Sequence, residues 1–575
     1  TTTNADGAFS FNVPAGNVVL EVSSVGFVTK DVQVAANQNT VEVVLTAQVG
    51  ELADVVVTAL GIKKEKKALG YALSEVKGDE LTKARTNSVV SNLVGKVAGL
   101  NVSSTATGAG GSTRVVLRGN TSISDNNQPL YVIDGVPLDN QNRGSAGMWG
   151  GSDAGDGIQM INPDEIETVS VLKGGNAAAL YGARASAGVI LITTKKGSSR
   201  KGLGIEINSN ATVESVIDYT EYQYTYGQGS MGAKPATQAN AQSLNSWGAK
   251  LDGTSVIQWD GVSRPYTAQK NNIKNFYKDG TNLNNSVSFY GGNDKSTYNF
   301  SMSDMDNKSI IPNSTLKRNN FSLNLGMNPV DNLSINVSAR YLRERARNRP
   351  RLSDSPGNAN FTIGLIPTSW DEATFSTSKI DPSNGGEAKF NGNDYVTNPY
   401  WSVENFKNND SRDRLIASIE SRYNISDAVY VRGRIATDQY TRASFGMEPQ
   451  YTRYTLGGSM SRQTDRFREF NGELIVGVKK DINAKINLDA FVGGNMMQNI
   501  DETQRYSGNN LLVPGFYHIN NMKDKGTDYY YSEKRIQSAF GSAELSYNNY
   551  LFLTVTGRND WSSTLPVDNN SYFYP

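Results

Sequence analysis

The sequence predicts a mainly β fold, in which strands of a transmembrane antiparallel β-barrel follow a compact α/β segment and a small β-domain. Two observations carry the barrel prediction. From residue 204 onward apolar and polar residues alternate, as Phe321, Leu323 and Leu325 do with Ser322 and Asn324. Short and long connections also alternate along this half. This pattern places turns on one rim and loops on the other, as in outer-membrane barrels.

Composition excludes several classes of function. The 575 residues include 56 Lys+Arg and 56 Asp+Glu, and the zero net charge removes the electrostatic case for binding nucleic acid. Cysteine is absent and His518 is the only histidine, so thiol chemistry and two-histidine metal sites are excluded. No apolar run reaches the roughly 18 residues of a spanning helix. By composition alone the chain is typical of a soluble protein.

Residues 1–47 predict a small β-sandwich. Short alternating strands follow one another, with a turn at Pro14-Ala15-Gly16, then Val18, Leu20 and Val22, and a last strand over 41–45. The run NADGAFSFNVPAGN at 4–17 resembles the carboxypeptidase-regulatory-like domain of Bacteroidota outer-membrane proteins, although any small β-domain fits the alternation equally. Because Thr1 is not a methionine, we expect the chain to be processed or incomplete at its front.

Residues 48–70 predict a linker with one β-branched strand, VVVTA at 55–59, followed by four lysines. A free strand of this kind exposes unpaired backbone groups, which can add to the sheet of another protein. The alternative is that it forms the last strand of the preceding domain.

Residues 71–200 predict a compact α/β domain with strands near 115–117, 131–133, 169–172 and 189–193 and a helix over 176–185. Arg114, Arg118, Asp134 and Arg184 flank these strands, and buried charges need partners. The partners lie either within this domain or across an interface with the barrel. Glycine-rich loops at 107–112 and 141–157 match no phosphate-binding pattern, and we interpret them as flexible outer loops.

Residues 201–575 predict the barrel, with about eleven strands of roughly nine to eleven residues, which is the length of a tilted bilayer span. Short turns are expected near 292–296, 328–332, 425–428, 480–484 and 548–549. Long connections are expected over 214–285, 304–319, 342–413, 440–468 and 495–536. A soluble sandwich would share the two-residue period. The connections, and strand-end tyrosines such as Tyr341, Tyr423 and Tyr547, favour a membrane barrel.

Further motifs give a specific resemblance. SNLVGKVAGLNVSS (91–104), VVLRGN (115–120), PLYVIDGVP (129–137), INPDEIETVSVLKGG (161–175) and ALYGARASAGVILITTKKG (179–197) occur in one order. With VVVTALGIKKEKKALGYA (55–72), they resemble the TonB box and plug domain of the SusC/RagA family of TonB-dependent outer-membrane transporters. GRNDWSSTLP (557–566) resembles a motif midway along that family's barrel. The resemblance implies a complete barrel of about 22 strands, of which roughly half is present here.

The resemblance also implies site residues and no catalytic centre, cofactor or metal site. The TonB contact comprises Asp54, Val55, Val56, Val57, Thr58 and Ala59. The plug motif, structural or gating, comprises Arg114, Arg118, Gly119, Asp134, Gly135, Lys173, Tyr181, Gly182, Arg184 and Gly188. Substrate contact is expected at Trp149, Asp153 and Asp156, and calcium at Asp153/Asp156 is the weaker alternative. Trp247, Trp259 and Trp401 either stack on sugars or, more often for loop tryptophans, pack within loops.

The implied function is active import of a glycan or peptide across the outer membrane, with a periplasmic N-terminal domain. The implied partners are the TonB C-terminal domain, which draws on the inner-membrane proton gradient, a SusD-like surface lipoprotein acting as a lid, and outer-membrane lipid. Two other classes were weighed. The barrel could serve as a docking subunit of a larger envelope assembly, or it could be a surface enzyme using His518, which we interpret as an ordinary loop residue.

Overall fold

The computed structural model describes residues 8–10, 16, 18–22, 30–35, 40–45, 55–57, 63–65, 73–83, 86, 88–104, 107–108, 110–123, 127–144, 146–173, 181–548 and 550–575. The chain forms two compact units. The first comprises Thr1–Val57 and Lys63–Leu69, and the second comprises Thr58–Ile62 and Gly70–Pro575.

The first unit contains two small antiparallel sheets in its described part. Strand β1 (Val18–Val22) pairs with β2 (Lys30–Val34), and β3 (Val55–Val57) pairs with β4 (Lys63–Glu65). The prediction of a strand over 41–45 is wrong, because residues 40–45 have no regular secondary structure. The predicted turn at 14–16 and the TonB-contact residues Asp54, Thr58 and Ala59 fall wholly or partly outside the described residues.

The N-terminal part of the second unit is the α/β plug. Its five-stranded sheet has the order β5-β10-β11-β8-β9, in which only β11 and β8 run parallel. Helix α1 (Gly78–Thr82) and a separate β6–β7 hairpin complete it. The predicted helix over 176–185 lies largely outside the described residues and ends in a short 3-10 turn, Ala183–Ala185. The plug strands are β5 (Leu73–Lys77), β6 (Leu100–Ser104), β7 (Thr113–Leu117), β8 (Leu130–Ile133), β9 (Val136–Leu138), β10 (Ile166–Leu172) and β11 (Val189–Thr194).

The plug strands are rich in β-branched residues and buried on both faces, so they form a core of their own. Ile133, Val169 and Ile190 are fully buried within it, together with Leu81 from α1. Burial of such side chains stabilises the plug by roughly 1.5–3 kcal/mol each. The plug is therefore an independently packed body.

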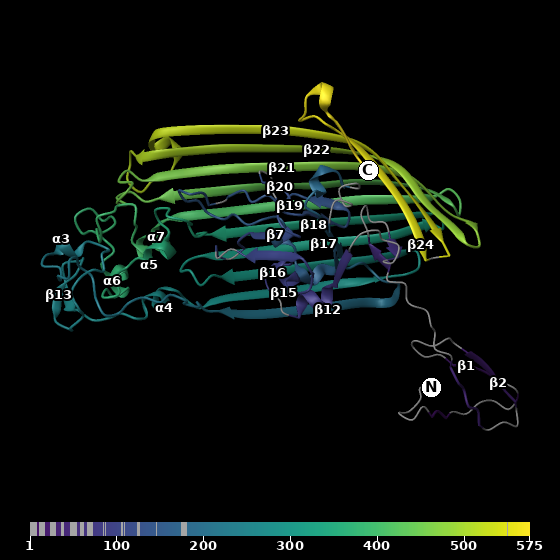
Figure 1. Cartoon of the computed structure of the whole chain (residues 1–575), viewed down its shortest axis with the longest axis horizontal. Helices are drawn as coiled ribbons and strands as arrows, with labels where there is room; N and C mark the ends of the chain where they lie inside the picture. Colours follow the sequence, from purple (N-terminus) through teal and green to yellow (C-terminus); the bar gives the residue numbers. More distant parts are fainter. Residues whose placement is uncertain are drawn as a thin grey trace. The chain divides into compact units, whose positions relative to one another are not determined.

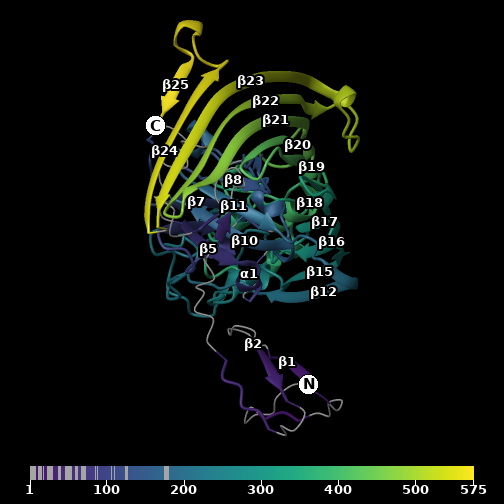
Figure 2. The same cartoon turned by 90° about the vertical axis from the view of Figure 1, so that its right-hand side faces the viewer.

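The remaining strands form one antiparallel sheet of twelve, in sequence order from β12 to β25 with β13 and β14 left out. The sheet curves around the plug, whose strands lie on its concave side (Figures 1 and 2). Its strands are β12 (Arg200–Glu214), β15 (Gly280–Gly292), β16 (Ser296–Lys308), β17 (Thr315–Val330), β18 (Leu333–Arg347), β19 (Lys407–Asn424), β20 (Val429–Glu448), β21 (Ser459–Asn483), β22 (Ile486–Leu511), β23 (Met522–Tyr547), β24 (Leu551–Ser562) and β25 (Ser571–Tyr574).

The strands are longer than expected from the sequence. β20 has 20 residues and β22 has 26, against the nine to eleven that were predicted. The loops shrink accordingly, so that residues 309–314 replace the predicted connection 304–319, and 449–458 replace 440–468. The alternation of short turns and longer loops is retained.

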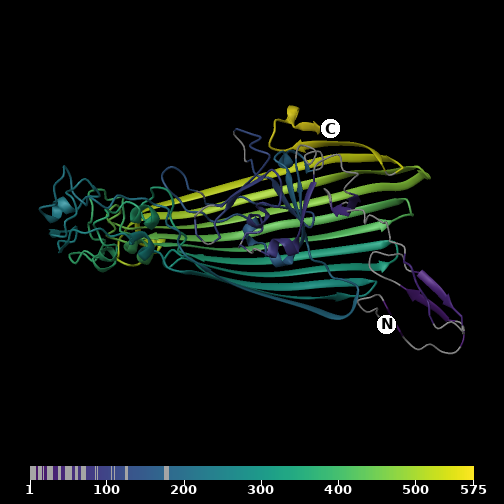
Figure 3. The same ribbon diagram turned by 60° about the horizontal axis from the view of Figure 1, so that its bottom comes forward.

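The two longest loops, residues 215–279 and 348–406, carry their own secondary structure at one end of the strands (Figures 1 and 3). Trp259, Trp370 and Phe375 are buried in a core shared by both loops. In the described part of the chain, no helix has the length and apolar character needed to cross a membrane. The loop elements are α3 (Gln238–Ala241), β13 (Ser255–Ile257), β14 (Ser263–Pro265), α4 (Asn272–Phe276), α5 (Ala359–Ile363), α6 (Ala373–Thr377) and α7 (Pro399–Asn405).

Candidate functional site

The candidate site is the contact between the plug and the inner wall of the sheet. Alternation along each strand sends polar side chains inward, where they are buried against the plug, and apolar side chains outward. Arg340 and Arg414, for example, are fully buried on this inner wall, whereas Leu474 and Val492 are exposed on the outer one. The wall therefore presents charge to the plug, and the plug must supply partners for it.

The first contact is made by the turn between β8 and β9. Asp134 and Gly135 both adopt positive φ, at 47° and 83°, as expected for an Asp-Gly two-residue turn. The Asp134 carboxylate accepts from Arg340 on β18 at 2.7 Å and from the Thr194 hydroxyl at 2.7 Å. Burial raises the pKa of Asp134, but Arg340 and Thr194 together lower it below the usual value. The plug turn thus satisfies a buried barrel arginine.

Two predicted glycines sit where the plug touches charged wall residues. A Cβ on Gly135 would lie 1.6 Å from Nη1 of Arg434, and a Cβ on Gly182 would lie 2.3 Å from Oδ2 of Asp560. Both glycines also have positive φ. At these two positions the plug backbone lies so close to the wall that a side chain would prevent the contact.

A second contact forms around the segment that follows β9. The guanidinium of Arg414 donates to the carbonyl of Asp139 at 2.7 Å and pairs with Asp438 at 2.5 Å. The Tyr440 hydroxyl donates to Asp139 Oδ2 at 2.8 Å and accepts from Arg143 at 2.7 Å. Arg143 also pairs with Asp501 at 2.5 Å. Residues 139–143 of the plug are thereby tied to three barrel strands.

Several further plug residues each contact one wall residue. Arg184 pairs with Glu469 at 2.9 Å, and Ser286 of β15 donates to Asp164 at 2.8 Å. Several wall residues donate to plug carbonyls: Arg318 to Gln159, Asn320 to Met160, Asn324 to Lys195, and Arg412 to Ala154.

Apolar contact across this interface is limited. Within the described residues, the wall contributes Leu342, Ile416 and Ala436 to the plug core, and Tyr181 of the plug packs against an apolar cluster of the wall formed by Tyr430, Ile475, Phe491 and Phe540. The plug therefore packs mainly against itself and meets the wall through hydrogen bonds and ion pairs. Such contacts can be exchanged for water at a smaller net cost than an apolar core.

Most of the other predicted plug residues lie away from the wall, and Tyr181 is the exception. Arg114 and Arg118 are exposed, and Arg114 donates to Asn120 at 3.1 Å, so the expectation of buried pairs is wrong for these two. Lys173 donates to Ser74 at 2.8 Å within the plug, and burial lowers its pKa. Gly119 is exposed. Gly188 packs inside the plug, where a Cβ would meet Leu117, whereas Tyr181 is half-buried between the plug core and wall residues that include Tyr430 and Phe540.

The three residues expected to contact substrate separate into two groups. Trp149 is 81% exposed, next to the exposed Met148. Asp153 and Asp156 are buried, and their oxygens accept hydrogen bonds from Ser112 and Thr113 of the plug. Burial raises the pKa of Asp156 to about 6. These two carboxylates therefore hold the plug loop together, whereas Trp149 is open to solvent.

The loop tryptophans also divide. Trp259 and Trp401 are buried in the loop cores, as packing residues, whereas Trp247 is 79% exposed. His518 accepts from the Asn520 amide at 3.2 Å and begins a short 3-10 turn. Among the described residues, no group of three or more histidine or acidic side chains is placed to hold a metal ion.

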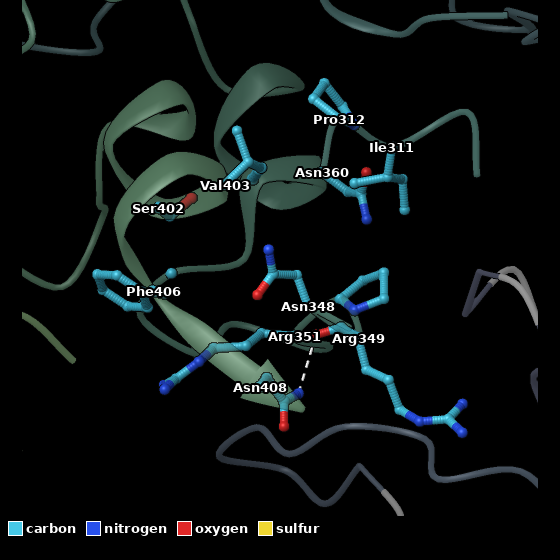
Figure 4. Close-up of a pocket in the computed structure, with 13 residues that line it drawn as sticks. Ile311, Pro312, Asn348, Arg349, Arg351, Asn360, Ser402, Val403, Phe406 and Asn408 are labelled. Carbon is cyan, nitrogen blue, oxygen red and sulfur yellow. Dashed lines mark hydrogen bonds between the residues drawn. The ribbon is translucent and has the colours of Figure 1, made fainter. Parts of the chain in front are cut away.

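A small pocket lies where the loop helices α5 and α7 meet the ends of the strands (Figure 4). Pro312, Val403 and Phe406 give it an apolar lining, and Asn348 and Asn408 add amides. The Asn408 side chain donates to the carbonyl of Arg349 at 2.8 Å, the bond drawn in Figure 4. The pocket therefore lies between the long loops and the loop-side ends of the strands.

Sequence reasoning missed the barrel half of this interface as a site. Arg340, Arg434 and Asp438 fall on the polar side of the alternation, but nothing local in the sequence indicates which plug residue each one meets. One sequence feature could have indicated the interface: charged residues recur at inward positions of β18 to β20, and charges that face a plug must be paired.

Comparison with known proteins agrees with this architecture. Residues 65–189 match the family model of the TonB-dependent receptor plug domain. The chain is 28% identical over 443 residues to the TonB-dependent receptor SusC of Bacteroides thetaiotaomicron, covering 76% of this chain and 40% of that protein. It is 25% identical over 596 residues to the TonB-dependent receptor P3 of Formosa agariphila, covering 100% of this chain and 53% of that protein.

Among solved structures, the fold matches the RagAB peptide importer in its open-open state with a TM-score of 0.71 at 17% identity, covering 90% of this chain and 57% of that chain. The closed-closed state gives a TM-score of 0.67 at 17% identity, covering 88% and 56%. The chain spans about half the length of the curated relatives it matches. Residues 65–189 thus match a TonB-dependent receptor plug domain, and over most of its length the chain is similar to TonB-dependent receptors of the SusC/RagA type, which are outer-membrane β-barrel proteins.

Proposed function

We propose that this receptor imports a large nutrient, a glycan or a peptide, across the outer membrane with energy delivered by TonB. The observation that carries the proposal is the polar contact between plug and wall. A plug that has its own apolar core but meets the barrel through exchangeable hydrogen bonds is suited to being displaced as a body.

The TonB contact is proposed at residues 54–59. Within it, Val55–Val57 form β3 and pair with β4 in a short hairpin. β-Branched residues in a three-residue strand form a small pairing surface, which a strand of a partner can replace. TonB would then pull on a segment that leads directly into the plug.

Substrate would enter from the rim that carries the long loops, because outer-membrane barrels place such loops outside the cell. The proposed contact on the plug is Trp149, which is exposed beside Met148. A SusD-like lipoprotein is the proposed lid over these loops. The RagAB neighbour is named a peptide importer, which supports a peptide as one of the two substrate classes.

The proposal is tested by deleting residues 54–59 in the whole protein in its native cells and measuring substrate-dependent growth. Uptake should be abolished while surface expression and substrate binding persist, since the plug and loops are unchanged. The control is a deletion of equal length at residues 40–45, which carry no regular secondary structure in the same unit. Normal growth of the 54–59 deletion would contradict import and favour a docking role.

A further inference from the structure

The outer wall of β16, β17 and β18 changes character along its length. Nearest the short turns, the outward positions are apolar and face lipid. Farther toward the long loops the same face becomes charged, starting at Asp304 and Asp306 on β16, at Lys317 on β17 and at Arg343 on β18. The apolar stripe comprises Tyr298, Phe300 and Met302 on β16, Phe321, Leu323 and Leu325 on β17, and Val337, Ala339 and Tyr341 on β18.

Beyond the stripe, toward the long loops, five outward residues form what we call the basic patch. They are Lys308, Lys317, Arg343, Arg345 and Arg347, all exposed. The strand register makes them neighbours. Lys317 lies opposite Arg345, while Thr315 lies between Lys308 and Arg347. The patch therefore spans three adjacent strands.

The patch carries more positive charge than its surroundings neutralise. Lys317 pairs with Asp306 at 2.7 Å, and Arg343 lies 3.5 Å from Asp413, in pairs that stay partly exposed. Arg345 and Arg347 have no carboxylate within ion-pair distance in the part of the chain that the structure describes. Two exposed guanidinium groups are thus available side by side on one strand.

The position of the patch matches the headgroup layer. Strands rise about 3.3 Å per residue, so Arg343, Arg345 and Arg347 lie roughly 7, 13 and 20 Å from Tyr341 along β18. Tyrosine marks the membrane–water boundary. The opposite ends of β17 and β18 show no such charge, because Met327, Val330 and Leu333 flank a turn whose charged residue is Asp331. The basic patch is therefore confined to the outer leaflet side.

We propose that the basic patch binds the phosphate of a phosphorylated glycolipid of the outer leaflet, with Arg345 and Arg347 as its main ligands. Guanidinium groups bind phosphate oxygens in a bidentate manner. The apolar stripe, which begins at Tyr341 on the membrane side of Arg343, would receive the acyl chains of the same lipid. The bound lipid would fix the height of the barrel in the membrane.

The test compares binding of lipid A to the full chain in detergent micelles by native mass spectrometry. The double variant R345Q/R347Q should lose roughly 30-fold in apparent affinity, since each basic residue at a membrane surface contributes about fivefold. The matched control is R466Q/R468Q, which removes two outward arginines of β21. Through Thr441 and Asp413, Arg466 lies in the same cross-strand row as Arg343, and it lies 3.7 Å from Glu502. The control should retain binding within about twofold.

Two further arms identify the source of the phosphate. Lipid A without its phosphates should bind the wild type as weakly as lipid A binds the double variant, and millimolar inorganic phosphate should not displace lipid A. Equal losses in both double variants, undiminished binding of the dephosphorylated lipid, or displacement by free phosphate would each overturn the proposal. All substitutions lie on the exposed face, and retained heat-modifiable migration on gels confirms that the variants are folded.

Discussion

At the scale of single residues, the function of the plug depends on pairs whose members are far apart in the sequence. Asp134 meets Arg340, and Arg184 meets Glu469. The first pair is buried, and without Asp134 the Arg340 guanidinium would keep only a longer contact with Glu165 at 3.7 Å; in the second pair Glu469 is buried and Arg184 is partly exposed. Weakening a buried ion pair by removing one member is costlier than never having had the pair. The motif residues could be recognised from the sequence, but their partners could not, because no local pattern encodes a contact between distant segments.

The pair of Asp134 and Arg340 gives the first prediction at this scale. Asp134→Asn should destabilise the seating of the plug by about 2 kcal/mol, because Arg340 loses its nearest carboxylate and keeps only the longer contact with Glu165 at 3.7 Å. Hydrogen exchange of the 130–138 segment should accelerate, as measured by mass spectrometry. Because the pKa of Asp134 is lowered in the folded protein, its stabilising contribution is complete above the usual carboxyl value and is lost only as the pH falls through the lowered one.

The effect of Asp134→Asn should therefore be the same at about pH 6 and about pH 8. The matched control is Asp394→Asn in the loops, whose carboxylate is 45% exposed and pairs with Arg453 at 3.1 Å. An exposed pair of this kind contributes about 0–1 kcal/mol. Equal exchange rates in wild type and Asp134→Asn would show that the ion pair does not hold the plug.

At the scale of elements, the strands were predictable where lipid imposes the alternation and unpredictable where it does not. The apolar face of β21 runs from Val478 to Phe470, and this part was readable from the sequence. Farther along, Arg468 and Arg466 occupy the same outward face in water, so the alternation ends although the strand continues. The predicted strands were too short for this reason. The folding of the long loops around Trp259 and Trp370 had no periodic signal at all.

The lipid-facing interpretation of β21 is testable by Leu474→Arg. Leu474 is 57% exposed on the outward face, and an arginine there should cost about 2–4 kcal/mol near the bilayer midplane. Leu456→Arg is the matched control, since Leu456 is 59% exposed but lies in the loop at 449–458 and should tolerate arginine. Folding yield into vesicles, read by heat-modifiable migration, measures both. Equal yields for the two variants would remove the case for a lipid-facing strand.

At the scale of the whole molecule, the plug is held together by an apolar core, whereas the wall contacts the plug mainly through polar groups. Leu342, Ile416 and Ala436 are the wall residues in the plug core. The sequence predicted both bodies, because each has its own pattern. It could not predict the strength of their contact, which depends on burial and on hydrogen-bond geometry across the interface.

The proposed transport cycle requires this contact to open, and because these 575 residues contain no cysteine, a pair of introduced cysteines can test that requirement. Ser286 of β15 donates to Asp164 of the plug at 2.8 Å, so cysteines at these two positions lie close enough for a disulfide or a short bismaleimide bridge. Bridging Ser286→Cys with Asp164→Cys should abolish substrate uptake by intact cells while leaving surface binding unchanged. Reductant should restore uptake in the disulfide form. Each single cysteine variant controls for loss of the hydrogen bond, and it should transport normally under oxidising conditions. Full uptake through the bridged protein would mean that substrate passes without displacement of this part of the plug, and the proposed mechanism would then be wrong.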